Sequence, residues 1–538
     1  MGLSDIKYRL KSTAGILLFP AITGILLAAA SMPSKLYWLN FLAFIPLLTG
    51  VEQLRKVKKP YLLFLLQLFL ALSVFFIWTG RWVLQTANMG FLLGLLLIVP
   101  FVVLISPYIL FKKNEAQYAL LYFLAAWLTA EMIQSYFQLG SPFFNLGHSI
   151  GKNPNLIQWY EYTGAVGGSL WVLAVNILLF SFGKALVYSD KYWYVKGVFV
   201  VAILLAPIIV SILIYRNYEE RGRSAEVLVV HPSTNNADVK YQKNIYELLD
   251  IYLGILKPGL TAETDYVVLP ETALTNTGWI KDYNRNLVFQ HWFDKTSDFP
   301  NLKLVTGAIA YEAIPDVEKI KGYEKIPGIR YSENYKTWYY TYNTALFLER
   351  ERPVQIRVKD KLVPYQEYAP YPRFMPRLKP VGIDFQFSTR EKNREVFIEE
   401  KNRKTAALIC YELVYGKQFY EKAREGAEAF FVLLNEGWYD DPKVPQQFLQ
   451  LSAIRAIENR RSIAHSSNLG ISAIINQKGE IMEKTNSEQP GYLRNQLRLN
   501  KSTTLYTSLG NYIGAIAAVI VLVGIFRGLV ILKPKVKS

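Results

Sequence analysis

Long stretches without a charged residue constrain the fold of this 538-residue chain more than any other feature. Seven of them lack Lys, Arg, Asp and Glu: Ser12–Ser34, Leu36–Val51, Tyr61–Gly80, Trp82–Phe111, Tyr162–Gly183, Gly197–Tyr215 and Ser502–Phe526. An eighth, Ala116–Gly151, contains only Glu131. Several reach the roughly 20 residues that a helix needs to cross about 30 Å of hydrocarbon. Residues 217–501, by contrast, are rich in charged side chains and contain no such stretch.

This pattern predicts an integral membrane α-helical bundle of eight spans with a soluble domain inserted before the last one. Residues 1–216 form the seven-span membrane domain, residues 217–501 the soluble domain, and residues 502–538 the closing span and a tail. The seven spans are predicted near Ser12–Met32, Leu36–Val51, Tyr61–Gly80, Gly90–Phe111, Tyr118–Leu139, Tyr162–Gly183 and Gly197–Tyr215.

Two features of the membrane domain are open to two interpretations each. Glu131 lies within the fifth predicted span, where a carboxylate either faces a cavity or partner or is hydrated near the outer interface. The segment Leu139–His148 is rich in aromatic residues, Gly and Pro. Because aromatic rings favour the headgroup level, it could border a lipid-binding groove, or it could be an ordinary interfacial turn.

The net charge of +17 indicates membrane topology rather than a nucleic-acid partner. If the N-terminus lies inside the cell, fifteen Lys and Arg residues of the short loops and ends are cytoplasmic, and only Lys35, Arg81 and Lys152 lie on the opposite side. This bias follows the positive-inside rule. It predicts a multi-pass protein of the bacterial inner membrane with residues 217–501 on the periplasmic face. The sequence contains no nucleic-acid-binding motif.

Residues 217–501 alternate apolar strand-like runs with helical patterns. Strands are predicted over Ala225–His231, Tyr266–Leu269, Lys303–Ala308, Tyr342–Leu348, Val354–Val358, Thr405–Cys410, Ala429–Leu434 and Ile471–Ile475, and helices over Lys243–Leu256 and Gln446–Arg460. Such alternation is typical of a layered α/β domain. Its chemistry is expected at the strand ends and in the loops that follow them.

Three reactive side chains occupy such positions. Glu271 follows the strand at Tyr266, Lys359 closes Val354–Val358, and Cys410, the only cysteine, closes its own strand. A thiol with a pKa near 8.5 is only slightly ionised at neutral pH. A nearby ammonium favours the thiolate and can stabilise an oxyanion, while a carboxylate can accept the proton as general base. Together, the three side chains would form a complete acyl-transfer set.

Other interpretations of these residues remain open at this point. A lone cysteine is often a small, buried core residue, and a single Glu or Lys is usually a solvated surface group. Alternatively, His231, His291 or His465 could serve as the base for Cys410, and the spacing favours none of the three. Without a second cysteine there is neither an intramolecular disulfide nor a shared cysteine metal site, and we expect no metal and no cofactor.

Three ordered segments resemble the motifs of the nitrilase, or carbon–nitrogen hydrolase, superfamily: Pro270–Ala273, Lys359–Glu367 and Ile409–Glu412. More closely, the chain resembles the apolipoprotein N-acyltransferase family, whose members carry a nitrilase-like domain before their last membrane span. The likeness extends to Pro142–His148 and Asn435–Tyr439. It implies that the soluble domain is a nitrilase-like αββα sandwich.

The resemblance also implies a role for each motif residue. The catalytic set would be Glu271 as base, Lys359 as oxyanion stabiliser and Cys410 as nucleophile. Supporting residues would be Glu367, which orients Lys359 or the substrate amine, and Tyr411 and Glu412 at the nucleophile turn. Asn435, Trp438 and Tyr439 would line the substrate pocket. The chain departs from the family at Gln366, where Gly is usual, and at Glu436, where Asp is common, which puts substrate positioning in doubt.

The reaction that the resemblance implies is a ping-pong transfer. Cys410 would take an acyl chain from a phospholipid as a thioester, and the α-amine of diacylglyceryl-cysteine on an apolipoprotein would resolve it to an amide. Two alternatives are a membrane-tethered amidase that uses water as acceptor, and a catalytically inactive membrane binding protein. The aromatic stretch Pro364–Phe387 could be a lid that dips into the membrane interface or a packed surface loop.

Overall fold

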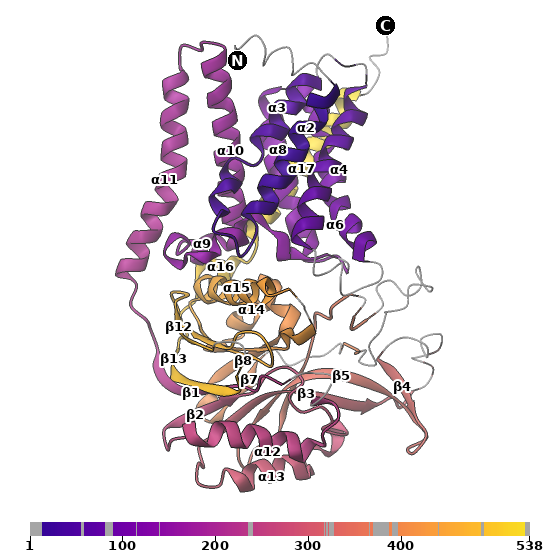
Figure 1. Ribbon diagram of the computed structural model, residues 1–538, viewed down its shortest axis with the longest axis vertical. Helices are drawn as coiled ribbons and strands as arrows, with labels where there is room; N and C mark the ends of the chain where they lie inside the picture. Colours follow the sequence, from indigo (N-terminus) through magenta and orange to yellow (C-terminus); the bar gives the residue numbers. More distant parts are fainter. Residues whose placement is uncertain are drawn as a thin grey trace. The chain divides into compact units, whose positions relative to one another are not determined.

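The computed structural model divides into two compact units, Met1–Arg216 with Leu509–Ser538, and Asn217–Ser508 (Figure 1). The residues that the structure describes are 13–54, 57, 59–80, 90–114, 116–138, 140–234, 240–316, 318, 321, 328–364, 366–368, 387–389, 396–438, 441–485 and 489–532. Most of the predicted lid, residues 369–386, therefore lies outside the described residues, together with Tyr365.

The first unit is built from apolar helices. Three are long and apolar enough to cross a membrane: α4 (Pro60–Thr79), α10 (Ala165–Val187) and α11 (Trp193–Asn217). Shorter apolar helices are Leu17–Ala30, Leu96–Phe111, Tyr118–Gln134 and Tyr512–Gly528. They belong to α2 (Thr13–Ala30), α6 (Gly90–Ile105) with α7 (Tyr108–Asn114), α8 (Ala116–Gln134) and α17 (Tyr512–Leu532). Within the described residues, the prediction of an apolar helical unit is confirmed, but the number of helices long and apolar enough to cross a membrane is three rather than eight.

The second predicted span, Leu36–Val51, is wrong as a continuous helix. It consists of a 3₁₀ turn, η1 (Tyr37–Phe41), and the short helix α3 (Ile45–Gln53). At 1.5 Å per residue the nine residues of α3 rise only about 13 Å. Pro46, in the first turn of α3, fits a helix start but not a helix interior.

Polar side chains from neighbouring helices satisfy the backbone at this break. The backbone amide of Phe44 donates to Asn176 Oδ1 at 2.9 Å, and the side-chain Nδ2 of Asn176 donates to Asn40 O at 2.7 Å. The amide of Leu47 donates to Thr23 Oγ1 at 3.0 Å. An unpaired backbone group is costly in an apolar environment, so these partners make the break tolerable.

Glu131 is buried inside the first unit, so its interpretation as a hydrated interfacial residue is wrong. It is 1% exposed and accepts hydrogen bonds from Trp127 Nε1 and from the amide of Leu146, both at 3.0 Å. Through Leu146 it holds the 3₁₀ turns η3 (Pro142–Phe144) and η4 (Leu146–Lys152), which are followed by η5 (Pro154–Leu156) and α9 (Tyr160–Thr163). Gly147 is required here because a Cβ would lie 1.8 Å from Ala165 O.

The second unit contains two mixed sheets. The first is seven-stranded, in the order β13-β1-β2-β3-β5-β4 with β6 paired to β5. Its strands are β1 (Arg223–His231), β2 (Thr264–Val268), β3 (Lys303–Ala313), β4 (Ile329–Ser332), β5 (Thr337–Leu348), β6 (Gln355–Val358) and β13 (Gly491–Leu499). The second is six-stranded, in the order β12-β11-β10-β9-β8-β7. Its strands are β7 (Phe397–Ile398), β8 (Lys404–Ile409), β9 (Ala429–Leu434), β10 (Ser462–Ser467), β11 (Ala473–Ile475) and β12 (Ile481–Lys484).

The two sheets pack face to face between two layers of helices, which confirms the predicted αββα sandwich. Strands β1, β3 and β5 contact β10, β9 and β8 across the interface between the sheets. The helices α12 (Ile245–Leu256) and α13 (Leu287–Lys295) cover the outer face of the first sheet (Figure 1). On the other side, α14 (Gly416–Arg424) and α15 (Lys443–Asn459) pack on the second sheet, and α16 (Leu505–Leu509) precedes α17.

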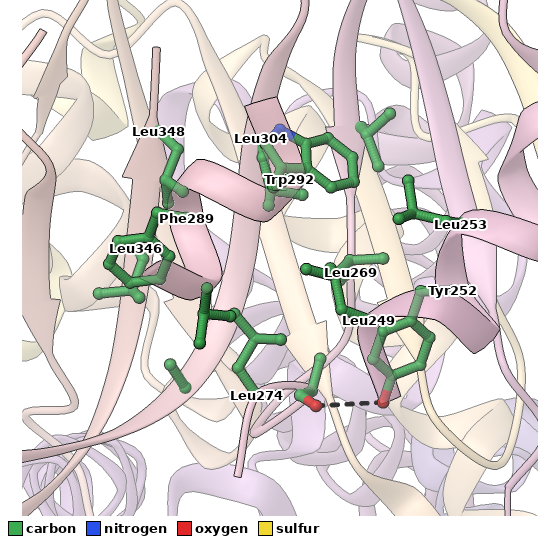
Figure 2. Close-up of a cluster of buried hydrophobic side chains, with 14 of the residues drawn as sticks. Leu249, Tyr252, Leu253, Leu269, Leu274, Phe289, Trp292, Leu304, Leu346 and Leu348 are labelled. Carbon is green, nitrogen blue, oxygen red and sulfur yellow. Dashed lines mark hydrogen bonds between the residues drawn. The ribbon is translucent and has the colours of Figure 1, made fainter. Parts of the chain in front are cut away.

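A continuous apolar cluster fixes the outer helices to the first sheet. Figure 2 shows Trp292 of α13 beside Leu304 of β3, and Tyr252 and Leu253 of α12 in the same cluster, on the side of Leu269. Each is at most 2% exposed. Burying side chains of this size contributes about 1.5–3 kcal/mol each relative to solvent exposure. This core holds the strand ends that carry the candidate site.

Candidate active site

The Lys359 side chain connects the two carboxylates of the predicted site. Its Nζ donates to Glu271 Oε1 at 2.8 Å and to Glu367 Oε1 at 2.9 Å. Lys359 directly follows β6, and its amide donates to Asn343 O at 2.9 Å, which fixes its backbone to the neighbouring β5. Because the side chain is only 1% exposed, both ion pairs are shielded from water.

Asn343 is a site residue that the sequence analysis missed. Its Nδ2 donates to Glu271 Oε1 at 2.8 Å and to Glu367 Oε1 at 3.2 Å, so it holds the same two oxygens as Lys359. The second oxygen of Glu367 accepts from the amide of Val363 at 2.7 Å. The only signal in the sequence is an amide side chain, Asn343, inside a strand whose other residues are apolar, aromatic or threonine.

The loop that carries Glu271 is fixed against both sheets. The Glu271 amide donates to Leu434 O, at the end of β9, at 3.3 Å. On the other side, the amide of Gly307 in β3 donates to Pro270 O at 3.1 Å. The absence of a side chain at Gly307 lets the Glu271 backbone approach this closely.

Replacing Gly307 with alanine is expected to displace Glu271 and lower kcat/KM by about 10²-fold, since a shift of about 1 Å in a catalytic group costs that much. A Cβ at Gly307 would lie 2.4 Å from the amide nitrogen of Thr272, a backbone atom that cannot simply rotate away. The matched control is Gly254→Ala on α12, where a Cβ meets nothing within 4 Å. Steady-state kinetics on both variants check this, and equal activity of Gly307→Ala and wild type would contradict it.

Cys410 lies at a sharp backbone turn between β8 and η11 (Cys410–Val414). Its φ of +47° is in the left-handed region that non-glycine residues rarely adopt, and such strain is typical of functional turns. The thiol is within hydrogen-bonding reach of the Glu271 carboxylate and close to the charges of Lys359 and Glu367. The structure therefore brings the three predicted catalytic residues together.

Glu412 holds the nucleophile turn in place. Its carboxylate accepts from the amides of Ile409 and Asp360, both at 2.7 Å. It also forms a two-point ion pair with Arg357, at 2.7 and 2.8 Å, with both side chains at most 1% exposed. Burial alone would raise the pKa of Glu412, but the charge and hydrogen bonds of Arg357, together with Lys422 and the Ile409 amide, outweigh it and lower that pKa. Glu412 is thus a fixed anion that ties the Cys410 turn to the Lys359 segment.

The protonation of Cys410 differs from the sequence-based expectation of a thiolate. Burial, followed by the charge of Glu271, raises the pKa of the Cys410 thiol well above its ordinary value, and Lys359 only partly offsets this. Burial alone would lower the pKa of Lys359, but Glu271 and Glu367 outweigh it and raise that pKa. The site therefore holds a neutral thiol beside a charged amine, so a nucleophilic role for Cys410 requires that the thiol lose its proton as it attacks.

The remaining predicted residues lie in different surroundings. Tyr411 is buried and packs edge-on against Tyr415, with ring centroids 5.4 Å apart. Asn435 is fully buried just after β9 and accepts from Asn468 Nδ2 at 3.3 Å. Trp438 ends η12 (Glu436–Trp438), but its side chain and Tyr439 lie outside the described residues.

The structure describes both residues at which the chain departs from the family motifs, Gln366 and Glu436. Gln366 donates its amide to Val363 O at 3.3 Å, in the turn before Glu367. Glu436 is 2% exposed and accepts from Ser467 Oγ at 2.8 Å, and burial raises the pKa of its carboxyl group to about 8.

The three histidines considered as bases form hydrogen bonds at other places. His231 Nδ1 is 3.0 Å from Ser467 O and Ser472 Oγ, His465 Nδ1 is 2.8 Å from Ser452 Oγ, and His291 Nε2 is 3.0 Å from Asp250. The geometry thus favours Glu271 over a histidine as the partner of Cys410. Among the described residues, no group of three His, Cys, Asp or Glu side chains is arranged to hold a metal ion.

Comparisons with known proteins match both units of the chain. The family model for the apolipoprotein N-acyltransferase N-terminal domain matches residues 23–178, and the carbon-nitrogen hydrolase model matches residues 243–505. An apolipoprotein N-acyltransferase of Chlorobaculum tepidum is 25% identical over 528 residues, which covers 91% of this chain and 92% of the relative. One of Pasteurella multocida is 25% identical over 402 residues, covering 72% and 70%.

A solved structure from the nitrilase superfamily, from Saccharomyces cerevisiae, is also similar, with 16% identity and a TM-score of 0.35. It covers 51% of this chain and 90% of its own. The two family models follow each other along the chain in the order of its two units, and the relatives match across most of their length. The chain is therefore an acyltransferase and belongs to the apolipoprotein N-acyltransferase family.

Proposed function

We propose that this enzyme transfers an acyl chain from a phospholipid to the N-terminal α-amine of diacylglyceryl-cysteine in apolipoproteins, through a thioester on Cys410. The observation that carries the proposal is the buried arrangement in which Lys359 bridges Glu271 and Glu367 next to the Cys410 thiol. The names of the relatives supply the substrate class, and the site supplies the chemistry.

In the first half-reaction, Glu271 accepts the thiol proton while Cys410 Sγ attacks the ester carbonyl carbon of the phospholipid. Two of the three N–H donors of Lys359 bind the carboxylates, which leaves one for the oxyanion that develops. The carbon–oxygen bond to glycerol then breaks, and Glu271 returns the proton to the glycerol oxygen. The products are a lysophospholipid and the Cys410 thioester.

In the second half-reaction, the lipoprotein α-amine attacks the thioester carbonyl carbon and Glu271 accepts a proton from that amine. The carbon–sulfur bond breaks, the amide forms, and the proton returns to Cys410 Sγ. The same base thus serves both steps in opposite directions. Glu367, with its pKa raised by burial and only partly lowered by Lys359, keeps Lys359 oriented throughout.

The apolar first unit supports a membrane location for both substrates. Moving a lipid chain into water costs about 0.8 kcal/mol per methylene, so a catalytic site that works on acyl chains belongs at a bilayer. We propose that the first unit lies in the bacterial inner membrane and that the catalytic domain is periplasmic, as the positive-inside bias predicts. In this assignment, residues 1–216 and 509–538 form the membrane domain and residues 217–508 the catalytic domain, the bounds of the two compact units.

The acceptor of the acyl group distinguishes this proposal from an amidase that uses water. Purified enzyme in detergent or vesicles would be given a phospholipid with a labelled acyl chain and a synthetic diacylated lipopeptide with a free α-amine. We expect the label on the peptide as an amide; the N-acetylated peptide, which has no free amine, is the matched control. Release of labelled fatty acid alone would favour water as acceptor. In a cell whose growth depends on this protein, unchanged growth with the Cys410→Ala variant would instead favour a catalytically inactive binding protein.

A further inference from the structure

A second buried lysine, Lys240, lies directly beneath the Glu271 loop. It is fully buried, and its Nζ donates to Glu271 O and to Thr272 Oγ1, both at 2.8 Å. Neither the motifs nor the spacing along the sequence pointed to it, because Lys240 stands in a polar stretch that reads as a loop. A buried ammonium is costly unless it is well bonded, so both contacts are expected to matter.

The backbone that Lys240 holds is strained. Thr272 has a φ of +47°, a conformation that a β-branched residue rarely adopts and that the surroundings must stabilise. Lys240 binds both the carbonyl on the N-terminal side of Thr272 and the hydroxyl of Thr272 itself. These two bonds fix the orientation of the peptide between Glu271 and Thr272, from which the Glu271 side chain projects.

Lys240 also affects the charge balance of the site. Glu271 and Glu367 share the positive charge of Lys359, and Lys240, in its protonated form, adds a second positive charge next to Glu271. Burial lowers the pKa of Lys240 to about 7, and the charge of Glu271 acts in the opposite direction. Among the described residues, the Thr272 hydroxyl and the ring of Tyr241, whose centroid is 5.8 Å away, also face its ammonium.

We infer that Lys240 is a positioning residue that aims the Glu271 carboxylate at the Cys410 thiol and at the acceptor amine. It does so from behind the loop, through backbone and hydroxyl contacts. Because both half-reactions use Glu271, loss of Lys240 should slow turnover more than it weakens substrate binding. The inference rests on the proposed function, in which Glu271 is the base.

The test compares Lys240→Met with Lys303→Met in the full-length enzyme. Lys303 is a matched control because it is another buried lysine of this domain, with its Nζ 3.1 Å from Asn301 O and above the Tyr266 ring. For Lys240→Met we expect kcat to fall roughly 10–100-fold, with KM changed less than about threefold. We expect the acidic limb of the kcat/KM profile to move to higher pH, since a positive charge next to Glu271 is lost. Lys303→Met should leave that limb unchanged.

Two further variants make the outcome decisive. If Lys240→Met does not fold, Lys240→Gln replaces it, because glutamine keeps an N–H donor but has no charge. We expect the acidic limb of its kcat/KM profile to move to higher pH as well. A folded variant with wild-type kcat and pH profile would overturn the inference. Glu271→Gln separates the two proposals: an active Glu271→Gln enzyme would refute the base itself, whereas an inactive one beside an unaffected Lys240 variant would refute only the role of Lys240.

Discussion

Replacing Cys410 with serine is expected to abolish acyl transfer, with a loss on the order of 10⁴-fold or more. The thiol is already held protonated by burial and by the charge of Glu271. A hydroxyl is a much weaker acid and a poorer nucleophile, so Glu271 would have to remove a far less acidic proton. Transfer of a labelled acyl chain to a diacylated lipopeptide, followed over time, measures the loss.

The serine variant should fold normally, because the two side chains are similar in size and both can donate to Glu271. Thermal unfolding of the two proteins is therefore the control, with melting temperatures expected within a few degrees. A folded serine variant that retains activity within tenfold of wild type would rule out Cys410 as the nucleophile.

Replacing Lys359 with alanine is expected to lower turnover by about 10²–10³-fold, the usual effect of removing an oxyanion donor. It also removes the charge between Glu271 and Glu367, and breaking a buried ion pair costs about 3–5 kcal/mol of folding stability. Because the folded pKa of Lys359 is raised, this stabilisation is fully present below its ordinary value of 10.5 and is lost only as the pH rises through the folded value.

The matched control for Lys359→Ala is Lys404→Ala. Lys404 begins the nucleophile strand β8, but its Nζ donates to Glu425 O, away from both carboxylates. We expect wild-type turnover and a small change in melting temperature for this control. A Lys359 variant that loses stability but keeps its turnover would show that the side chain is structural and that another donor stabilises the oxyanion.

The three residues of the proposed catalytic set could be singled out from the sequence because they follow the strands on which a layered α/β domain depends. Strands β2, β6 and β8 each end in apolar residues. Lys359 and Cys410 come directly after β6 and β8, and Glu271 follows the end of β2 by three residues. The strand β10 (Ser462–Ser467) was not predicted, because it contains polar side chains although all of its residues are buried. Ser466 is accommodated there by a hydrogen bond to Val230 O, 236 residues away in the sequence.

Contacts between distant residues explain the other misses. Asn343, Lys240 and Arg357 are polar residues whose roles depend on the fold that brings Glu271, Glu367 and Glu412 to them. Likewise, the break in the second predicted span depends on Asn176 and Thr23, which lie on other helices. Hydropathy measures only how apolar a segment is, so it cannot reveal a helix interrupted by such partners.

The thiolate expectation failed for an electrostatic reason. Pairing a thiol with an ammonium lowers its pKa when solvent is nearby, but Cys410 is buried with two carboxylates and one close amine. Which effect dominates depends on burial and on the number of charges within reach, and neither can be read from the sequence. Proton transfer to Glu271 therefore becomes part of the attack itself.

The most direct test of the central claim is to trap the acyl-enzyme. The purified protein would be incubated with a phospholipid of defined acyl chains and no lipopeptide, denatured at acidic pH, digested and analysed by mass spectrometry. The account predicts one acyl chain attached to the peptide that contains Cys410, removable by hydroxylamine and by added lipopeptide amine. An acyl group on any other residue, or no acyl group in an enzyme that still transfers the label to lipopeptide, would contradict it.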